Sequence, residues 1–248
     1  MRGLGEVKRL VGEYGQARDH HTQVLALARH LGFRRAEAEA LRGLGEVERL
    51  VGEYGQARDY HTQALALARH LGDRPGEVLV LRGLGEVERL VGKYGQARDY
   101  YTQALTLARH LGYRRAEADA LCGLGEIEWL VGECVQAGEY YTQALDLARQ
   151  LGYRFGELLA LHGLGEVERV VGEYGHSREY HTQALALGRR LGDRRAEADA
   201  LWGLGHVASG TAAPGQAREL WRQALKIYEE LGVPFAETVR VAMCQLDC

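Results

Sequence analysis

The side chains best suited to nucleophilic chemistry are Cys122 and His162, which would form a thiolate–imidazole pair if they met. They stand 40 residues apart, the interval at which the sequence repeats itself, so they occupy equivalent places on successive structural units. Packed helices lie about 10 Å apart, which is beyond hydrogen-bond reach. The two serines, Ser177 and Ser209, stand in no nucleophile motif, and the sequence has no metal or phosphate motif. We therefore expect no enzymatic activity, no cofactor and no metal.

The residues best suited to binding form three columns that recur with the same period. In residues 41–80 these residues are Arg42, Glu46 and Arg49, which are three and four positions apart and therefore share one face of a helix. From residue 82 onward, the columns supply the candidate binding residues, which are Arg82, Glu86, Arg89, Cys122, Glu126, Trp129, His162, Glu166, Arg169, Trp202 and His206.

The early repeats keep arginine and glutamate in these columns, whereas the later repeats replace them. The replacements are Cys122, Trp129, His162, Trp202 and His206. They are informative because neighbouring repeats tolerate the default residue, and tryptophan is common at binding hot spots. We expect the recognition site to lie between residues 122 and 206. Two plainer interpretations stay open: the charged columns pair with themselves in solvent, and the replacements reflect drift near the end of the array.

Two helices in each repeat position these columns. Apolar residues recur at spacings of three and four in residues 35–52 and again in 56–71, which predicts two amphipathic helices. Gly52 and Gly72 follow the two segments as C-cap signals, and Asp73 stands where a cap for the next helix is expected. Recurring glycines inside the first helix of each repeat predict the close approach of a neighbouring backbone.

Neither helix buries its apolar stripe alone, so we expect the pairs to stack into an all-α solenoid. Residues 41–80 and 81–120 match at 31 of 40 positions, which favours one continuous array over residues 1–248. The N-terminal end has no evident cap, so we expect it to pair with another copy or with a further domain. The expected parts are a truncated first unit (1–32), units at 33–72, 73–112, 113–152, 153–192 and 193–232, and a C-terminal capping helix (233–248).

The repeats resemble the tetratricopeptide repeat. The family pattern of a large apolar residue, Leu-Gly, Gly-x-Tyr, Ala, an aromatic residue and Ala maps onto Leu41, Leu44-Gly45, Gly52-Glu53-Tyr54, Ala57, His61 and Ala64. The match recurs through residues 1–232, but the period is 40 residues rather than 34, and Glu48 fills a slot that is usually small or aromatic. The longer repeat is similar to those in sensor regions of bacterial multidomain regulators and in kinesin light chains.

This resemblance implies a right-handed superhelix whose first helices line a concave groove, so that the three columns face a ligand. It implies a scaffold that binds a peptide or protein segment there, with a regulatory role. Two alternatives stay open: a small-molecule-binding or biosynthetic protein that uses the aromatic half of the groove, and a self-assembling structural module. The groove lacks the lysine and asparagine set with which some family members bind a peptide carboxylate.

Charge and composition limit the partners. The formal net charge is −3 and both signs occur in every repeat, which disfavours direct binding to nucleic acid or to a membrane surface. No apolar run approaches the roughly 18–20 residues that cross a bilayer. The first ten residues are already repeat sequence, so we expect no signal peptide and a cytoplasmic location. The four cysteines are expected to be free thiols.

A second period of 80 residues is also present. The first helix begins RRAEAEA or RRAEADA at residues 34–40, 114–120 and 194–200, but RPGEVLV or RFGELLA at 74–80 and 154–160. The alternation is a relic of duplication or, if functional, places acidic and apolar residues in turn along one surface.

Overall fold

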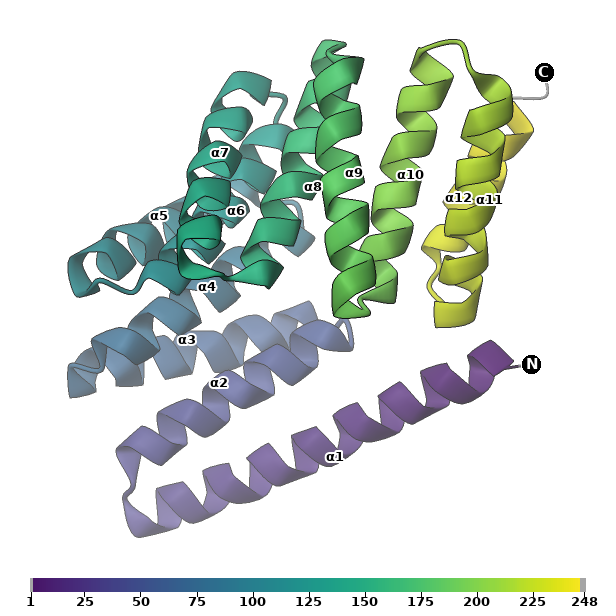
Figure 1. The fold of residues 1–248 in the computed structure, drawn as a ribbon. Helices are drawn as coiled ribbons and strands as arrows, with labels where there is room; N and C mark the ends of the chain where they lie inside the picture. Colours follow the sequence, from purple (N-terminus) through teal and green to yellow (C-terminus); the bar gives the residue numbers. More distant parts are fainter. Residues whose placement is uncertain (1, 246–248) are drawn as a thin grey trace. The chain divides into compact units, whose positions relative to one another are not determined.

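The computed structural model describes the backbone of residues 2–245 and the side chains of residues 13–244. Within this range the chain forms twelve α-helices and no strand, which confirms the all-α prediction (Figure 1). The helices are α1 (Arg2–Leu31), α2 (Arg34–Leu50), α3 (Tyr54–Leu71), α4 (Arg74–Leu90), α5 (Tyr94–Leu111), α6 (Arg114–Leu130), α7 (Cys134–Leu151), α8 (Arg154–Val171), α9 (Tyr174–Leu191), α10 (Arg194–Gly210), α11 (Pro214–Leu231) and α12 (Phe235–Gln245).

Each repeat is a pair of helices, which we call the A helix and the B helix. The A helices are α2, α4, α6, α8 and α10, and the B helix of each pair follows it. Short turns reverse the chain where the sequence predicts them: Gly52 and Gly72 adopt φ values of +88° and +64°, which favour glycine. Asp73 then caps α4, because its carboxylate accepts a hydrogen bond of 3.1 Å from the backbone N–H of Gly76.

The first repeat differs from this pattern. Gly12 stands at the position equivalent to Gly52, but no turn forms there, and α1 runs without interruption from Arg2 to Leu31.

The chain divides into two compact units. We call Arg9–Ile127 the first unit; the second unit is Glu128–Cys248 together with Met1–Lys8. The boundary falls inside α6, so this helix contributes residues to both units. Each unit contains stacked helix pairs, and a single array over the whole chain stays a prediction.

Rings from the B helices fill the space left by glycines of the A helices. An added Cβ would lie 2.7 Å from the His61 ring at Gly45 and 2.8 Å from it at Gly83. His61, on α3, is therefore held between glycines of α2 and α4. The predicted approach of a neighbouring backbone was thus wrong in one respect: the atoms that approach belong to a side chain, and the missing Cβ makes room for its ring.

The same packing recurs along the chain with other ring types. The Tyr101 ring of α5 packs over Gly85 and Gly123. An added Cβ would lie 3.0 Å from this ring at Gly85 and 2.4 Å from it at Gly123. In the second unit, His181 of α9 takes this place. The slot therefore accepts tyrosine or histidine, and the choice changes the polarity of the core beside it.

Buried ion pairs explain the glutamate that departs from the family pattern. Glu48 and Glu88 are only 2% exposed, and each is bound by an arginine of the preceding B helix. Arg18 donates to Glu48 from Nε at 2.8 Å and from Nη2 at 2.7 Å. Arg58 binds Glu88 through the same two nitrogens. A two-point contact of this kind satisfies a buried carboxylate that would otherwise be costly.

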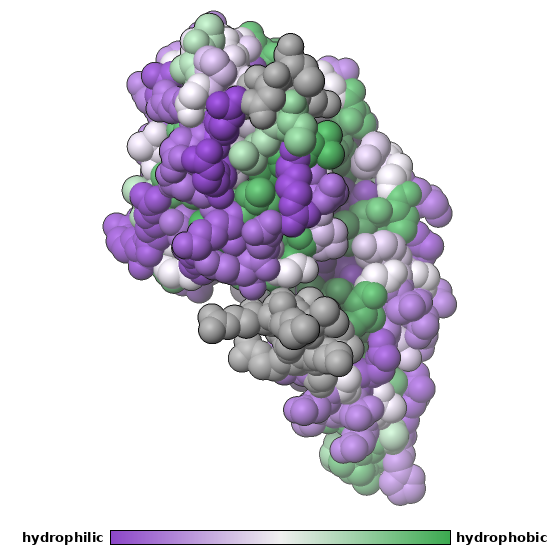
Figure 2. Space-filling model, turned by 90° about the vertical axis from the view of Figure 1, so that its right-hand side faces the viewer, coloured by the Kyte–Doolittle hydropathy of each residue, from purple (hydrophilic) through white to green (hydrophobic). Residues whose placement is uncertain are grey.

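The predicted C-terminal capping helix (233–248) is helical from Phe235 to Gln245, residues 233–234 precede the helix, and residues 246–248 lie outside the described range. α12 packs against α11, and its Ala236 and Val239 join a cluster with Trp221 and Tyr228. On the side of the molecule that faces the viewer in Figure 2, hydrophobic residues remain at the surface between hydrophilic ones. Val241 of α12 is 50% exposed. Among the described residues, no helix combines the length and the apolar character that crossing a bilayer requires.

Candidate binding face on the A helices

In the first unit, the exposed face of the A helices carries a chain of ion pairs. Arg49 donates to Glu46 on its own helix at 3.0 Å, and its Nη1 lies 3.8 Å from Glu86 of the next A helix. Arg89 donates in turn to Glu86 at 2.6 and 3.0 Å, and its Nη1 lies 3.0 Å from Glu126. The candidate residues Glu86, Arg89 and Glu126 are therefore already partnered within the unit.

Tyr101 connects this surface to the core. Its hydroxyl donates to Glu86 at 2.9 Å, while its ring fills the glycine slot beneath. Burial would raise the pKa of Glu86, but the hydrogen bonds from Arg89 and Tyr101 outweigh it and hold that pKa below its usual range. Farther along, burial raises the pKa of Glu126 despite its contact with Arg89. This face is thus fixed by its own charges.

Two further candidates on this face have partners or little surface. Arg82 binds Asp119 of the next A helix through an ion pair. Cys122 is 7% exposed, and burial raises the pKa of its thiol, followed in size by the effects of Asp119 and Glu126. The structure therefore gives Cys122 little surface to offer a ligand, although the sequence placed it in a surface column.

In the second unit, α8 carries exposed apolar residues at positions where α6 carries the charged residues Arg115 and Asp119. Phe155 and Leu159 on α8 are 53% and 37% exposed. They precede His162, Glu166 and Arg169 at spacings of four and three, so all five share one face of α8. Glu166 accepts hydrogen bonds from Nη2 and Nε of Arg169 at 2.7 and 3.1 Å. The result is a surface with an apolar half and a charged half.

Two imidazoles lie beneath this surface. The rings of His162 and His181 are 5.8 Å apart and meet edge to face. Among the described side chains, both ring nitrogens of His181 and Nδ1 of His162 are buried without a hydrogen-bond partner. Nε2 of His181 lies 3.5 Å from a carboxylate oxygen of Glu166, which is the outer limit of hydrogen bonding. Burial, followed by His181, lowers the pKa of His162, so the neutral form of the His162 imidazole is favoured here.

The carboxylate above these rings is strongly acidic. Burial would raise the pKa of Glu166, but His181 and Arg169 reverse this and lower it to about 2. On the next A helix, burial lowers the pKa of His206 to about 4, and Arg169 adds to this effect. At neutral pH these column residues therefore carry the Glu166 carboxylate, the Arg169 guanidinium and the neutral imidazoles of His162 and His206.

Trp202 belongs to the packing at the C-terminal end as well as to the face. Its ring centroid lies 4.2 Å from that of His206, 5.2 Å from that of Trp221 and 5.6 Å from that of Phe235. Its backbone carbonyl accepts a hydrogen bond of 3.1 Å from Nε1 of Trp221. Because of these contacts, replacing Trp202 disturbs α11 and α12 as well as any ligand contact.

The structure thus brings the candidates together in two groups. One is the ion-paired group of the first unit, and the other is the group of His162, Glu166, Arg169, Trp202 and His206 in the second. Trp129 is half-buried near the end of α6 and belongs to the second unit.

Phe155, Leu159 and His181 were not among the binding residues predicted from the three columns. Phe155 and Leu159 belong to the segment RFGELLA, which differs from the RRAEADA of the neighbouring repeats. They were not selected because they precede the three columns, which begin at residue 162 in this repeat. His181 was visible as a histidine in the aromatic slot, yet its position under Glu166 depends on packing. Among the described side chains, no group of three or more histidine, cysteine, aspartate or glutamate residues is arranged to hold a metal ion.

The repeats match a known family, and the fold matches solved structures. The family model for the tetratricopeptide repeat matches residues 1–70, 76–150 and 156–230. No curated protein sequence matches this chain. The structure of BtubC (BKLC) from P. vanneervenii is similar, with a TM-score of 0.72, 19% identity and coverage of 93% of this chain and 92% of that one.

Two further structures are similar at low identity. One is a Rap protein complexed with Competence and Sporulation Factor, with a TM-score of 0.71, 16% identity and coverage of 99% of this chain and 73% of that one. The other is PH0952 from Pyrococcus horikoshii, a signal-transduction ATPase with a tetratricopeptide repeat sensor. It has a TM-score of 0.69 and 16% identity, with coverage of 96% of this chain and 40% of that one. At these identities the likeness concerns the fold.

Proposed function

Because the chain belongs to the tetratricopeptide repeat family, we propose that its A-helix face in the second unit binds a peptide or protein segment. The observation that carries this proposal is the contrast between equivalent positions. Arg115 and Asp119 of α6 correspond to Phe155 and Leu159 of α8, which are exposed. Exposed apolar side chains beside fixed charges are typical of interaction surfaces.

The chemistry of this face favours a segment with an apolar residue next to a charged one. Phe155 and Leu159 would cover the apolar part, and Trp129 offers a further aromatic surface. Glu166 and Arg169 would contact the polar part, and the ligand would then compete with the ion pair that these two residues form with each other. A helix or an extended strand with mixed charge fits this requirement.

The solved relatives support a binding role. The similar Rap structure is a complex with Competence and Sporulation Factor, and the similar PH0952 carries its repeats as a sensor. By analogy, we propose a non-catalytic, regulatory role for this chain in the cytoplasm, as the sensor part of a larger regulator or as a separate adaptor.

The test begins with peptides selected from a random display library on the wild-type protein. Their affinity is then measured by fluorescence anisotropy for the double variant Phe155→Arg/Leu159→Asp, which gives α8 the residues of α6. We expect at least about tenfold weaker binding, because two apolar contacts are replaced by hydrated charges.

Val135→Gly is the matched control. Val135 is an apolar residue of α7 that is 80% exposed, and glycine stands at the equivalent position of α3 and α5. It should leave the affinity unchanged, and light scattering should show the same oligomeric state for all three proteins. Peptides that bind the double variant as tightly as the wild type would refute the proposed face.

A further inference from the structure

A column of arginines on the B helices normally satisfies a buried glutamate on the following A helix. Arg18 binds Glu48 and Arg58 binds Glu88, and in both pairs the arginine stands 30 residues before the glutamate. The two glutamates are each 2% exposed, so the guanidinium supplies the hydrogen-bond donors that each buried carboxylate needs inside the protein.

One repeat keeps the glutamate but lacks the arginine. Gly138 of α7 stands where Arg58 stands in α3, and Glu168 of α8 stands where Glu88 stands in α4. The Glu168 side chain is 24% exposed, and its carboxylate lies 3.8 Å from Nδ1 of His176, a group that is charged only when protonated. The carboxylate is thus retained without the two-point partner that its equivalents have.

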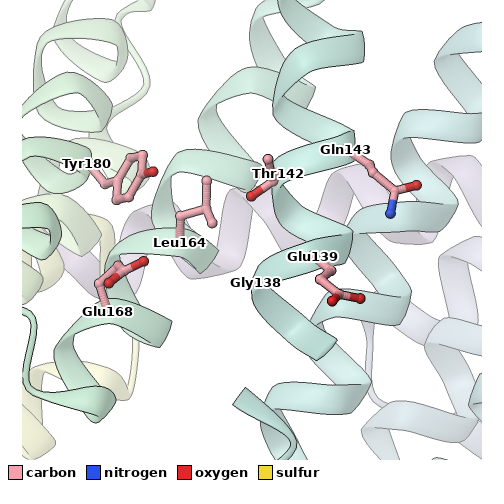
Figure 3. A pocket seen from close by; sticks show the side chains of 7 residues that line it. All are labelled: Gly138, Glu139, Thr142, Gln143, Leu164, Glu168 and Tyr180. Atoms are coloured by element: carbon pink, nitrogen blue, oxygen red, sulfur yellow. The ribbon is translucent and has the colours of Figure 1, made fainter. Parts of the chain in front are cut away.

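A cavity lies where the arginine would be. Its volume is about 460 Å³, it opens to solvent, and Figure 3 shows the residues of α7, α8 and α9 that line it. The lining residues are Gly138, Glu139, Thr142, Gln143, Leu164, Glu168 and Tyr180. None of these seven carries a positive charge, and two are carboxylates. The cavity therefore favours a cation.

The lining matches the surroundings of an arginine in the first unit. The guanidinium of Arg58 binds the Glu88 carboxylate, and Glu88, followed by Asp59 and Tyr100, raises the pKa of Arg58. The residues 80 positions later are Glu168, Glu139 and Tyr180, and all three line the cavity. Three groups that act on Arg58 thus have equivalents around the cavity, where the chain has a glycine instead of an arginine.

We propose that this cavity binds the guanidinium group of an arginine side chain presented by a partner polypeptide. The planar group would donate two hydrogen bonds to Glu168, as Arg58 does to Glu88. Leu164 would contact its methylene groups, and Tyr180 would face it from α9. This site is separate from the A-helix face and adds a second point of contact with a partner.

A polypeptide is favoured over free arginine because of the charges around the cavity. The α-carboxylate of free arginine would lie close to Glu139 and Glu168, with none of the seven lining residues to neutralise it. An arginine within a chain has no such carboxylate. Lysine is disfavoured because an ammonium group cannot match two carboxylate oxygens with a planar pair of donors.

The experiment measures binding of N-acetyl-arginine-amide by NMR chemical-shift perturbation, with free arginine and N-acetyl-lysine-amide as the other arms. We expect saturable binding of the arginine amide, with shifts at Thr142 and Tyr180, and at least about tenfold weaker binding of the other two. Equal binding of the lysine amide, or no saturable binding of the arginine amide, would overturn the proposal.

Variants test the geometry. Gly138→Arg should fill the cavity from within and abolish binding, and Glu168→Gln should weaken it at least about tenfold. Gly138→Ala is the matched control, since an added Cβ there meets only Val167 Cγ1, at 3.7 Å. It should bind as the wild type does. Binding that survives in both Gly138→Arg and Glu168→Gln would place the ligand elsewhere and refute the site.

A gain-of-site variant completes the test. Arg58→Gly reproduces the Gly138 arrangement beside Glu88, so the arginine amide should bind there and raise the thermal midpoint of this variant more than that of the wild type. An arginine amide that leaves the midpoint of Arg58→Gly unchanged would contradict the idea that the arginine position is what the ligand fills. None of these readouts involves Phe155 or Leu159, so the outcome is independent of the A-helix face.

Discussion

The two units use the same repeat and treat their charges in different ways. In the first unit, arginines and glutamates of successive A helices bind one another, and arginines of the B helices bind buried glutamates behind them. In the second unit, apolar residues of α8 stand where α6 has charges, imidazoles replace the column residues at His162 and His206, and Gly138 replaces one B-helix arginine. Residues that satisfy each other have little left for a ligand, so binding is expected where the internal pairing fails.

The largest difference between the units should appear in stability at the two glutamate sites. Arg58→Ala leaves a buried Glu88 carboxylate without its partner and should cost about 3–4 kcal/mol. Glu168→Gln should cost less than about 0.5 kcal/mol, because its carboxylate has no bound arginine and is partly exposed. Urea unfolding of both variants measures the contrast. Equal losses would mean that Glu168 is satisfied in some other way.

The ring in the glycine slot should control how stability depends on pH. Burial lowers the pKa of His61 to about 4, below the 6.5 of an ordinary histidine, so the unfolded chain binds more protons between these values. This stabilisation is complete above pH 6.5 and is lost as the pH falls toward 4, amounting to about 3 kcal/mol.

His61→Tyr should remove that part of the pH dependence, since tyrosine already fills the equivalent slot at Tyr101. The measurement is the free energy of unfolding of variant and wild type between pH 7.5 and 4.5. His70→Gln is the control, because His70 is exposed and Gln150 stands at an equivalent position. A pH profile of His61→Tyr that parallels the wild type would show that His61 is not the group that titrates.

In both units, the A-helix glycines that face a ring should tolerate an added Cβ equally poorly. Gly163→Ala would place a Cβ 2.3 Å from the Tyr141 ring and should cost about 2 kcal/mol through overpacking. Gly55→Ala, in a helix but with nothing within 4 Å of the added Cβ, should stabilise by about 0.5–1 kcal/mol. Thermal unfolding distinguishes these signs. A stabilising Gly163→Ala would mean that the Tyr141 ring moves freely out of the slot.

The smallest effect on stability is expected on the proposed binding face. Phe155→Arg/Leu159→Asp changes exposed residues of α8 to those of α6 and should alter the free energy of unfolding by less than about 0.5 kcal/mol. Trp202→Ala should be clearly destabilising, because Trp202 packs against Trp221 and Phe235. Urea unfolding of the two variants tests this order, and a reversed order would show that Phe155 and Leu159 contribute to the core.

Much of the fold was predictable because its signals are local. The apolar spacing in residues 35–52 and 56–71 and the glycines at 52 and 72 fix where each helix lies and ends. The same glycine at residue 12 does not end a helix, since α1 continues to Leu31, so this local signal alone does not enforce a turn. The column residues were found for the same local reason, since their spacing places them on one helix face.

What each column residue does was not predictable, because it depends on neighbours from other helices. Cys122 lies in a surface column but is buried, and Trp202 serves the C-terminal packing. Phe155 and Leu159 became candidates only when their exposure was known. The sequence shows that residue 138 is glycine where equivalent positions have arginine. What this arginine binds became known only from the contact between Arg58 and Glu88 in the structure.

By itself, the sequence determined the helix pairs, their period and the faces on which charges recur, because helix formation and amphipathic spacing act over a few residues. The tertiary structure decided which glutamates are buried and paired, which rings enter the glycine slots, and where a cavity opens between α7, α8 and α9. These features join residues of different helices, so they follow from how the helices stack rather than from any one segment.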